Sequence, residues 1–215
     1  AATFSGDVSV PNISVADDIR HTGDSDTYIS FEANNQTYYS GGTRALDLAS
    51  GSAVFNEGGG DVDFRVESNG NANMLFVDGG TNNVGIGLVP TSFSSRTSLD
   101  IGLGGKLWAL TTATETGLGN NFYFDGAYKR LTTNSASRHI QDGNGHTLSV
   151  AASGAANSTI TWIDALIIDS SGAATFSGDI ILPSTGKLYS SGDTDSFLQF
   201  NQANTLRAII GDSTR

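Results

Sequence analysis

Large apolar residues recur two positions apart along most of this chain. Side chains two positions apart lie on the same face of an extended strand, so each such pair predicts a short β-strand. The clearest pairs are Val8 and Val10, Ile29 and Phe31, Leu46 and Leu48, Phe64 and Val66, Leu75 and Val77, Val84 and Ile86, Trp108 and Leu110, Phe122 and Phe124, Ile160 and Trp162, Ile180 and Leu182, and Leu198 and Phe200.

Glycine-containing turns separate these predicted strands. Examples are Gly41-Gly42, Asn69-Gly70 and Asp125-Gly126, and glycine favours the positive φ angles that tight turns need. Only Ile13 to Arg20 could form a helical turn. The pattern therefore predicts an all-β fold of short strands and tight turns.

One segment of the chain occurs twice. Residues Ala2 to Pro11 reappear as Ala174 to Pro183, and the likeness continues after a slip of register. There Gly23-Asp24-Ser25-Asp26 matches Gly192-Asp193-Thr194-Asp195, Tyr28 matches Phe197, and Phe31 matches Phe200. We expect a modular protein, of which this chain is a segment.

A second, shorter motif suggests where the modules end. An apolar strand that finishes in Asp and then turns through glycine occurs at Ala45–Gly51, Leu75–Gly79 and Leu166–Gly172. These positions predict four modules, at residues 1–51, 52–92, 93–173 and 174–215, of which the last is a truncated second copy of the first.

The composition narrows the possible functions. The net charge of −11 and the pI near 4.4 argue against nucleic-acid binding, which needs clustered Lys and Arg to neutralise phosphates. The chain has no cysteine, which excludes disulfides and thiolate metal sites. Its sequence contains no apolar run of membrane-spanning length and no signal peptide at its start.

The predicted strands carry only one or two large apolar residues each. A single layer of such strands would have a thin core and exposed edges, which costs stability and invites aggregation. Three parallel chains that pool their inner faces would remove both problems. We therefore expect a homotrimer, with Phe4 and Phe176 of the repeat packed toward a core between chains.

Several segments resemble one known family. They are His21–Phe31, Gly41–Asp47, Asn82–Gly87, Phe122–Lys129, Ala151–Gly154 and Leu166–Asp169. Together these segments resemble the shaft and distal modules of bacteriophage tail fibres, above all fibres of phages that infect marine bacteria, some of which end in an intramolecular chaperone domain.

The resemblance implies an elongated homotrimeric fibre built of successive β modules of β-prism, β-helix or β-sandwich type. It implies a location in the tail fibre of the virion, contacts with other tail proteins, and attachment to a bacterial surface receptor such as a glycan. We expect no enzymatic activity, no cofactor, no nucleic-acid partner and no membrane insertion. The alternatives are a tailspike-like polysaccharide depolymerase and a trimeric bacterial surface adhesin.

The acidic residues offer two candidate sites. Asp24 with Asp26, and their counterparts Asp193 and Asp195, could bind calcium, but they lack the further oxygen ligands of a full site, and we interpret them as turn residues. Asp61 and Asp63 would share one strand face, where paired carboxylates could hydrolyse glycosides. We interpret this second pair as a solvated strand face.

The remaining candidates also favour a structural interpretation. His21, His139 and His146 are far apart in sequence and are expected in turns. The stretch Gly102–Lys106 lacks the full phosphate-loop pattern. We expect a β-domain core from the dense aromatic residues Trp108, Phe122, Tyr123, Phe124, Tyr128 and Trp162, and exposed aromatic rings at Tyr38 and Tyr39. No catalytic, cofactor or metal-binding residue is predicted.

Overall fold

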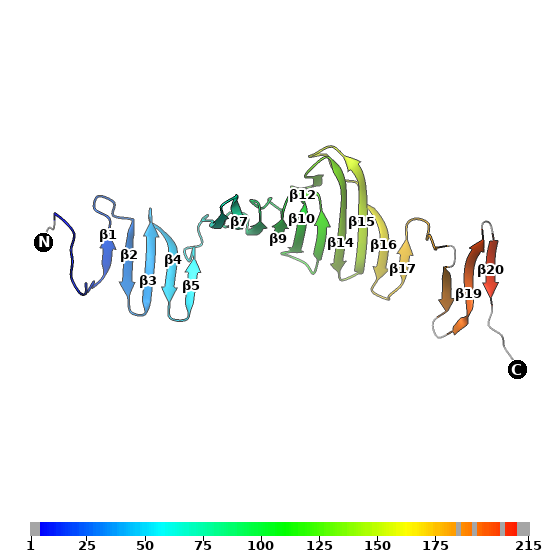
Figure 1. Ribbon diagram of the computed structural model, residues 1–215, viewed down its shortest axis with the longest axis horizontal. Helices are drawn as coiled ribbons and strands as arrows, with labels where there is room; N and C mark the ends of the chain where they lie inside the picture. Colours follow the sequence, from blue (N-terminus) through cyan, green and yellow to red (C-terminus); the bar gives the residue numbers. More distant parts are fainter. Residues whose placement is uncertain (1–4, 184–185, 191–192, 203–204, 210–215) are drawn as a thin grey trace.

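The computed structural model describes residues 5–183, 186–190, 193–202 and 205–209. These residues form strands, turns and loops without a helix, so the predicted all-β class is confirmed. None of them forms a helix of the length and apolarity that crossing a membrane requires. The sheets follow one another along the long axis of the chain, and most strands run across that axis (Figure 1).

The first sheet consists of five antiparallel strands in sequence order, joined by a loop between the first two and by tight turns between the others. The strands are β1 (Asp18–Arg20), β2 (Tyr28–Glu32), β3 (Asn35–Ser40), β4 (Thr43–Ala49) and β5 (Ser52–Phe55). Neighbours in sequence are thus neighbours in space, which is the simplest arrangement for strands joined by tight turns.

The second sheet has ten strands, and its order also follows the sequence. Its strands are β6 (Phe64–Ser68), β7 (Asn71–Asp78), β8 (Asn83–Ile86), β9 (Arg96–Ile101), β10 (Gly105–Leu110), β11 (Thr116–Asn120), β14 (Asn134–Asp142), β15 (Gly145–Gly154), β16 (Ile163–Asp169) and β17 (Ala174–Phe176). All its pairs are antiparallel except β8 with β9.

The main core of the described residues lies on one face of this second sheet. The short pair β12 (Phe122–Phe124) and β13 (Tyr128–Arg130) forms a separate two-stranded sheet. Its aromatic rings pack with Phe93 and Trp108, and Phe122 is completely buried.

The prediction of an aromatic β-domain core is confirmed for Trp108, Phe122, Phe124, Tyr128 and Trp162. It is wrong for Tyr123, which lies outside this core and whose hydroxyl bonds Asn157 at 3.1 Å. Phe93, in the loop before β9, is a member that the sequence analysis missed.

A third sheet contains β18 (Lys187–Ser190), β19 (Asp193–Gln202) and β20 (Thr205–Ile209). Ile19 pairs with Ile29 between β1 and β2, and Leu188 pairs with Leu198 between β18 and β19. The same register therefore joins the corresponding residues of the two similar segments.

Some predicted strands are wrong. Val8, Val10, Ile180 and Leu182 lie outside strands, although the stretches are apolar. Each stretch ends at a proline, which has no N–H to donate to a strand ladder. Ile160 forms no strand with Trp162, and Ile13 to Arg20 contributes the strand β1 where a helical turn was considered.

The predicted module boundaries stay a prediction, because a sheet can continue from one module into the next. β4 pairs with β5 across residue 51, β8 with β9 across residue 92, and β16 with β17 across residue 173.

Candidate functional site

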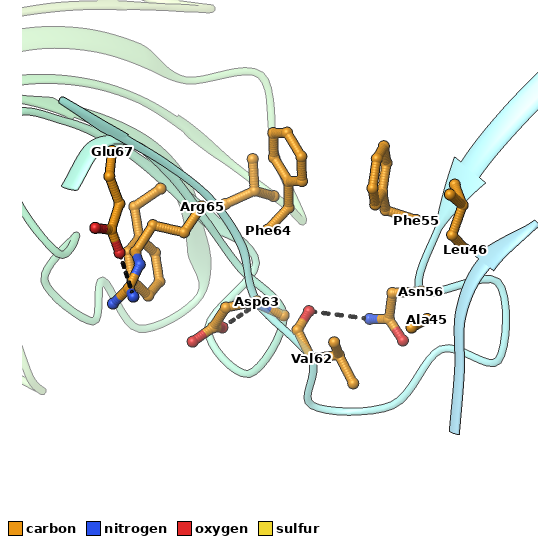
Figure 2. A pocket seen from close by; sticks show the side chains of 12 residues that line it. Ala45, Leu46, Phe55, Asn56, Val62, Asp63, Phe64, Arg65 and Glu67 are labelled. Carbon is orange, nitrogen blue, oxygen red and sulfur yellow. Dashed lines mark hydrogen bonds and ion pairs between the residues drawn. The ribbon is translucent and has the colours of Figure 1, made fainter. Parts of the chain in front are cut away.

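An open groove lies between the first and second sheets. Its volume is about 830 Å³, and its walls come from β4 and β5 on one side and from the start of β6 and the end of β7 on the other. Phe55 and Phe64 stand side by side in it, with ring centroids 4.6 Å apart, and Leu46 points the same way (Figure 2). The wall of the groove is therefore largely aromatic and aliphatic.

Three carboxylates gather beside this groove. One oxygen each of Asp61, Asp63 and Asp78 lies within 4.8 Å of the others. The backbone N–H of Gly79 donates to Asp63 at 3.1 Å, and that of Thr81 donates to Asp78 at 2.7 Å. Oxygen ligands of this kind can hold a hard cation such as Ca²⁺.

The predicted strand face for Asp61 and Asp63 is wrong, because both residues lie in the loop before β6. The sequence analysis also missed Asp78, the third member of the cluster. The available signal was the Asp-Gly-Gly turn that ends β7. A Cβ on Gly80 would lie 2.7 Å from a carboxylate oxygen of Asp61, so this glycine lets the turn approach the cluster.

Asp24 and Asp26 form a turn, as expected. The N–H of Asp26 donates to the carboxylate of Asp24 at 3.2 Å, which is a common bond of aspartate turns. The hydrogen bond between the two side chains lowers the pKa of Asp24 and raises the pKa of Asp26. The counterparts Asp193 and Asp195 belong to β19, and their side chains lie outside the described residues.

Two histidines that are far apart in sequence meet in the structure. His139 and His146 lie on β14 and β15, with Nε2 of the first 3.2 Å from Nδ1 of the second. The expectation of turn histidines is wrong for both, because the pairing of these two long strands brings them together. His21 lies in the loop between β1 and β2, as expected.

Lys106 is buried and forms an ion pair with Asp100, its direct neighbour across β9 and β10. Burial lowers the pKa of the Lys106 ammonium, and the contact with Asp100 opposes that shift. Ser98 and Thr91 accept further hydrogen bonds from this ammonium group. A side chain enclosed in this way is not available to a phosphate, which agrees with rejecting a phosphate loop here.

The predicted exposed tyrosines are half-buried. The ring of Tyr39 stacks on Tyr28 at 4.4 Å, and the guanidinium of Arg20 lies over Tyr28. Tyr38 lies on the other face of the same sheet, opposite Ile29. Phe176 is about half exposed within one chain, whereas Phe4 lies outside the described residues.

Comparison with known proteins gives little. No protein-family model and no curated protein matches the chain. Among solved structures, the chain is similar to one titled "Geobacillus virus E2 - ORF18", with a TM-score of 0.34 and 15% sequence identity. The match covers 54% of this chain and 26% of that chain. A similarity at this level carries no argument about function.

Proposed function

We propose that the chain is a structural virion protein, a segment of a homotrimeric bacteriophage tail fibre that contributes to attachment to the host surface. Its partners are two identical chains, neighbouring tail proteins and a receptor on the bacterium. It has no catalytic role and needs no cofactor. The proposal is supported by the resemblance of its motifs to tail-fibre modules and by its extended succession of sheets.

The observation that carries the proposal is the amount of surface that one chain exposes. The accessible surface is 14319 Å² for 22.3 kDa. A globular monomer of this mass exposes about 9,400 Å², so the single chain exposes about 4,900 Å² more. Stable protein interfaces take about 800 Å² from each partner, and obligate ones take more. The excess is large enough for extensive contacts with identical chains.

The first test is the mass of the native protein in solution. Light scattering on the purified chain should give about three times 22.3 kDa, and a mass of one chain would overturn the homotrimer.

The second test is the location of the protein in the virion. Gold-labelled antibodies against the chain should mark the tail fibres of virions of the phage that encodes it, and label confined to the capsid would contradict the proposed role.

A polysaccharide depolymerase is the second candidate, because carboxylates lie beside an aromatic groove. Asp63 borders the groove that Phe55 and Phe64 line, and Asp61 lies next to it. Retaining glycosidases place two carboxyl groups about 5–5.5 Å apart. One oxygen of Asp61 lies within 4.8 Å of one oxygen of Asp63, which is comparable to this separation.

The depolymerase candidate predicts release of reducing ends from host capsular polysaccharide. The Asp61→Asn and Asp63→Asn variants should abolish that release, and Asp142→Asn, an exposed change on β14, should not. The absence of reducing ends with the unmodified protein would eliminate this candidate.

A further inference from the structure

The two faces of the strands differ completely in charge. Alternate side chains point to opposite faces, and the strand pairings assign each residue to one of them. In β9, for example, Asp100 lies on the face of the aromatic core, whereas Leu99 and Ile101 lie on the other. Every Asp, Glu, Lys and Arg of strands β1–β11 and β14–β17 lies on the first face. We call the second one the uncharged face.

A single line of aligned residues crosses the uncharged face. Each residue pairs directly with the next across neighbouring strands, and the Phe55–Phe64 ring contact joins the two sheets. This apolar row consists of Ile19, Ile29, Tyr38, Leu46, Phe55, Phe64, Val77, Val84, Leu99, Leu107, Leu118, His139, Leu148, Leu166 and Phe176.

The apolar row runs along the chain, because its strands run across the long axis (Figure 1). At about 4.8 Å per strand, its fifteen positions extend roughly 70 Å. Leu118 is 60% exposed, and no other described part of the chain covers the row at Leu107, Leu148 or Phe176. A second line beside it is also rich in apolar residues, including Val66, Leu75, Ile86, Ile101, Val150 and Ile163.

We propose that the uncharged face is the surface along which copies of this chain associate, parallel and in register, with the apolar row at the centre of the contact. This inference rests on the proposed function and specifies the interface that the homotrimer uses. An exposed apolar surface of this length is typical of a protein interface and is a liability in a monomer.

The charge of the chain favours the uncharged face as the surface on which copies meet. Each chain carries a net charge of −11, so two copies repel each other wherever their charged surfaces meet. On the uncharged face this repulsion is weakest. The surplus surface of about 4,900 Å² per chain favours further copies of the chain as the occupant, because obligate interfaces take roughly 1,000–2,500 Å² from each partner.

The parallel, in-register arrangement follows from the proposed homotrimer, because chains related by a three-fold axis run parallel and at the same height. It sets each residue against its own counterpart, so leucine meets leucine on successive strands. His139 is the single polar side chain that interrupts the aliphatic and aromatic residues, and in register it meets another imidazole. Any shift by one strand would set this imidazole against leucine, where its polar nitrogen finds no new partner.

Two matched substitutions test the assignment of the face. Leu148 and Ile167 lie on neighbouring strands, β15 and β16, on opposite faces, and are 40% and 37% exposed within one chain. Leu148→Lys should convert the assembly to single chains in light scattering, whereas Ile167→Lys should leave the mass of the unmodified protein. An unchanged mass for Leu148→Lys, or loss of assembly in both variants, would overturn the proposal.

Cross-linking tests the register, since the natural chain contains no cysteine. Under mild oxidation Leu118→Cys should give a covalent dimer of the chain, and Ile167→Cys should not. No dimer from Leu118→Cys would overturn the in-register contact. A monomeric unmodified protein would overturn the proposed homotrimer itself, whereas an unmodified trimer that resists Leu148→Lys would overturn only the assignment of the face.

Discussion

Gly117 lies directly against the ring of Trp108. A Cβ at this position would lie 1.9 Å from the indole, and one at Gly119 would lie 2.3 Å from Phe122. The two glycines of β11 therefore provide the space that the aromatic core fills. In the sequence the same two residues weaken the signal for a strand, because glycine lacks the side chain that packs in a sheet.

We predict that Gly117→Ala destabilises the fold by about 1–3 kcal/mol, because the new methyl group must displace the Trp108 ring from a packed core. The free energy of unfolding in urea measures this cost. The control is Gly143→Ala, where the nearest atom would lie 3.9 Å away. Equal effects of the two changes would show that the space beside Gly117 does not determine how Trp108 packs.

Asp47 gives a prediction on pH. The Thr37 hydroxyl donates to its carboxylate at 2.7 Å and, with Arg44, holds the pKa of Asp47 below its ordinary value of 3.8. The folded state therefore binds fewer protons than the unfolded state. The stabilisation is fully present above pH 3.8 and is lost as the pH falls through the lower pKa of the folded protein.

Thr37→Val should reduce this loss, because it removes the hydrogen bond that favours the charged carboxylate. The measurement is the Tm of both proteins between about pH 6 and about pH 2. The unmodified protein should lose more thermal stability than the variant on acidification. Parallel curves would show that Thr37 does not set the pKa of Asp47.

At the scale of the element, Asn83 fixes the one parallel strand pair among the described residues of the second sheet. Its buried side chain accepts from the N–H of Ser98 at 2.8 Å and donates to the carbonyl of Thr91 at 3.3 Å. It thereby connects β8, the loop after it and β9. The Asn-Val-Gly-Ile-Gly motif, which contributed to the resemblance to fibre modules, thus has a structural role at this crossover.

Asn83→Ala should cost about 1–3 kcal/mol, because it leaves the buried N–H of Ser98 without its partner. Urea unfolding measures the change. Asn134→Ala is the control, since the exposed Asn134 side chain bonds only the next residue, Ser135. If both variants unfold alike, the crossover is held by the strand ladder and not by Asn83.

The sequence predicted most strands but not which way they face. The pairs Leu46 with Leu48, Phe64 with Val66, and Val84 with Ile86 do form strands, because alternation depends only on local geometry. Their apolar sides lie on the uncharged face and not on the aromatic core, and no local pattern separates these two cases.

Contacts between distant residues were the least predictable from sequence. His139 meets His146, and Asp78 joins Asp61 and Asp63, only through the pairing of long strands and the path of a turn.

The strand predictions at Val8–Val10 and Ile180–Leu182 failed for a local reason, since a proline follows each stretch. Prolines at these positions should have lowered the expectation of a strand.

At the scale of the whole molecule, the separation of charge from the apolar row determines how salt should act on assembly. Identical chains with a net charge of −11 repel one another at long range. Salt shortens the range of that repulsion, from about 30 Å at 0.01 M to about 3 Å at 1 M. A contact through the uncharged face contains no ion pair for salt to weaken.

Assembly through the uncharged face should therefore become stronger as sodium chloride is added. Light scattering over a dilution series should show dissociation at a lower protein concentration in about 1 M salt than in about 0.01 M salt. Leu148→Lys should give single chains at both salt concentrations, because salt does not remove the cost of burying its ammonium group in the contact. If salt instead dissociates the unmodified assembly, ion pairs between chains hold it together. These would come from the opposite face or from the turns and loops, since no Asp, Glu, Lys or Arg of strands β1–β11 and β14–β17 lies on the uncharged face.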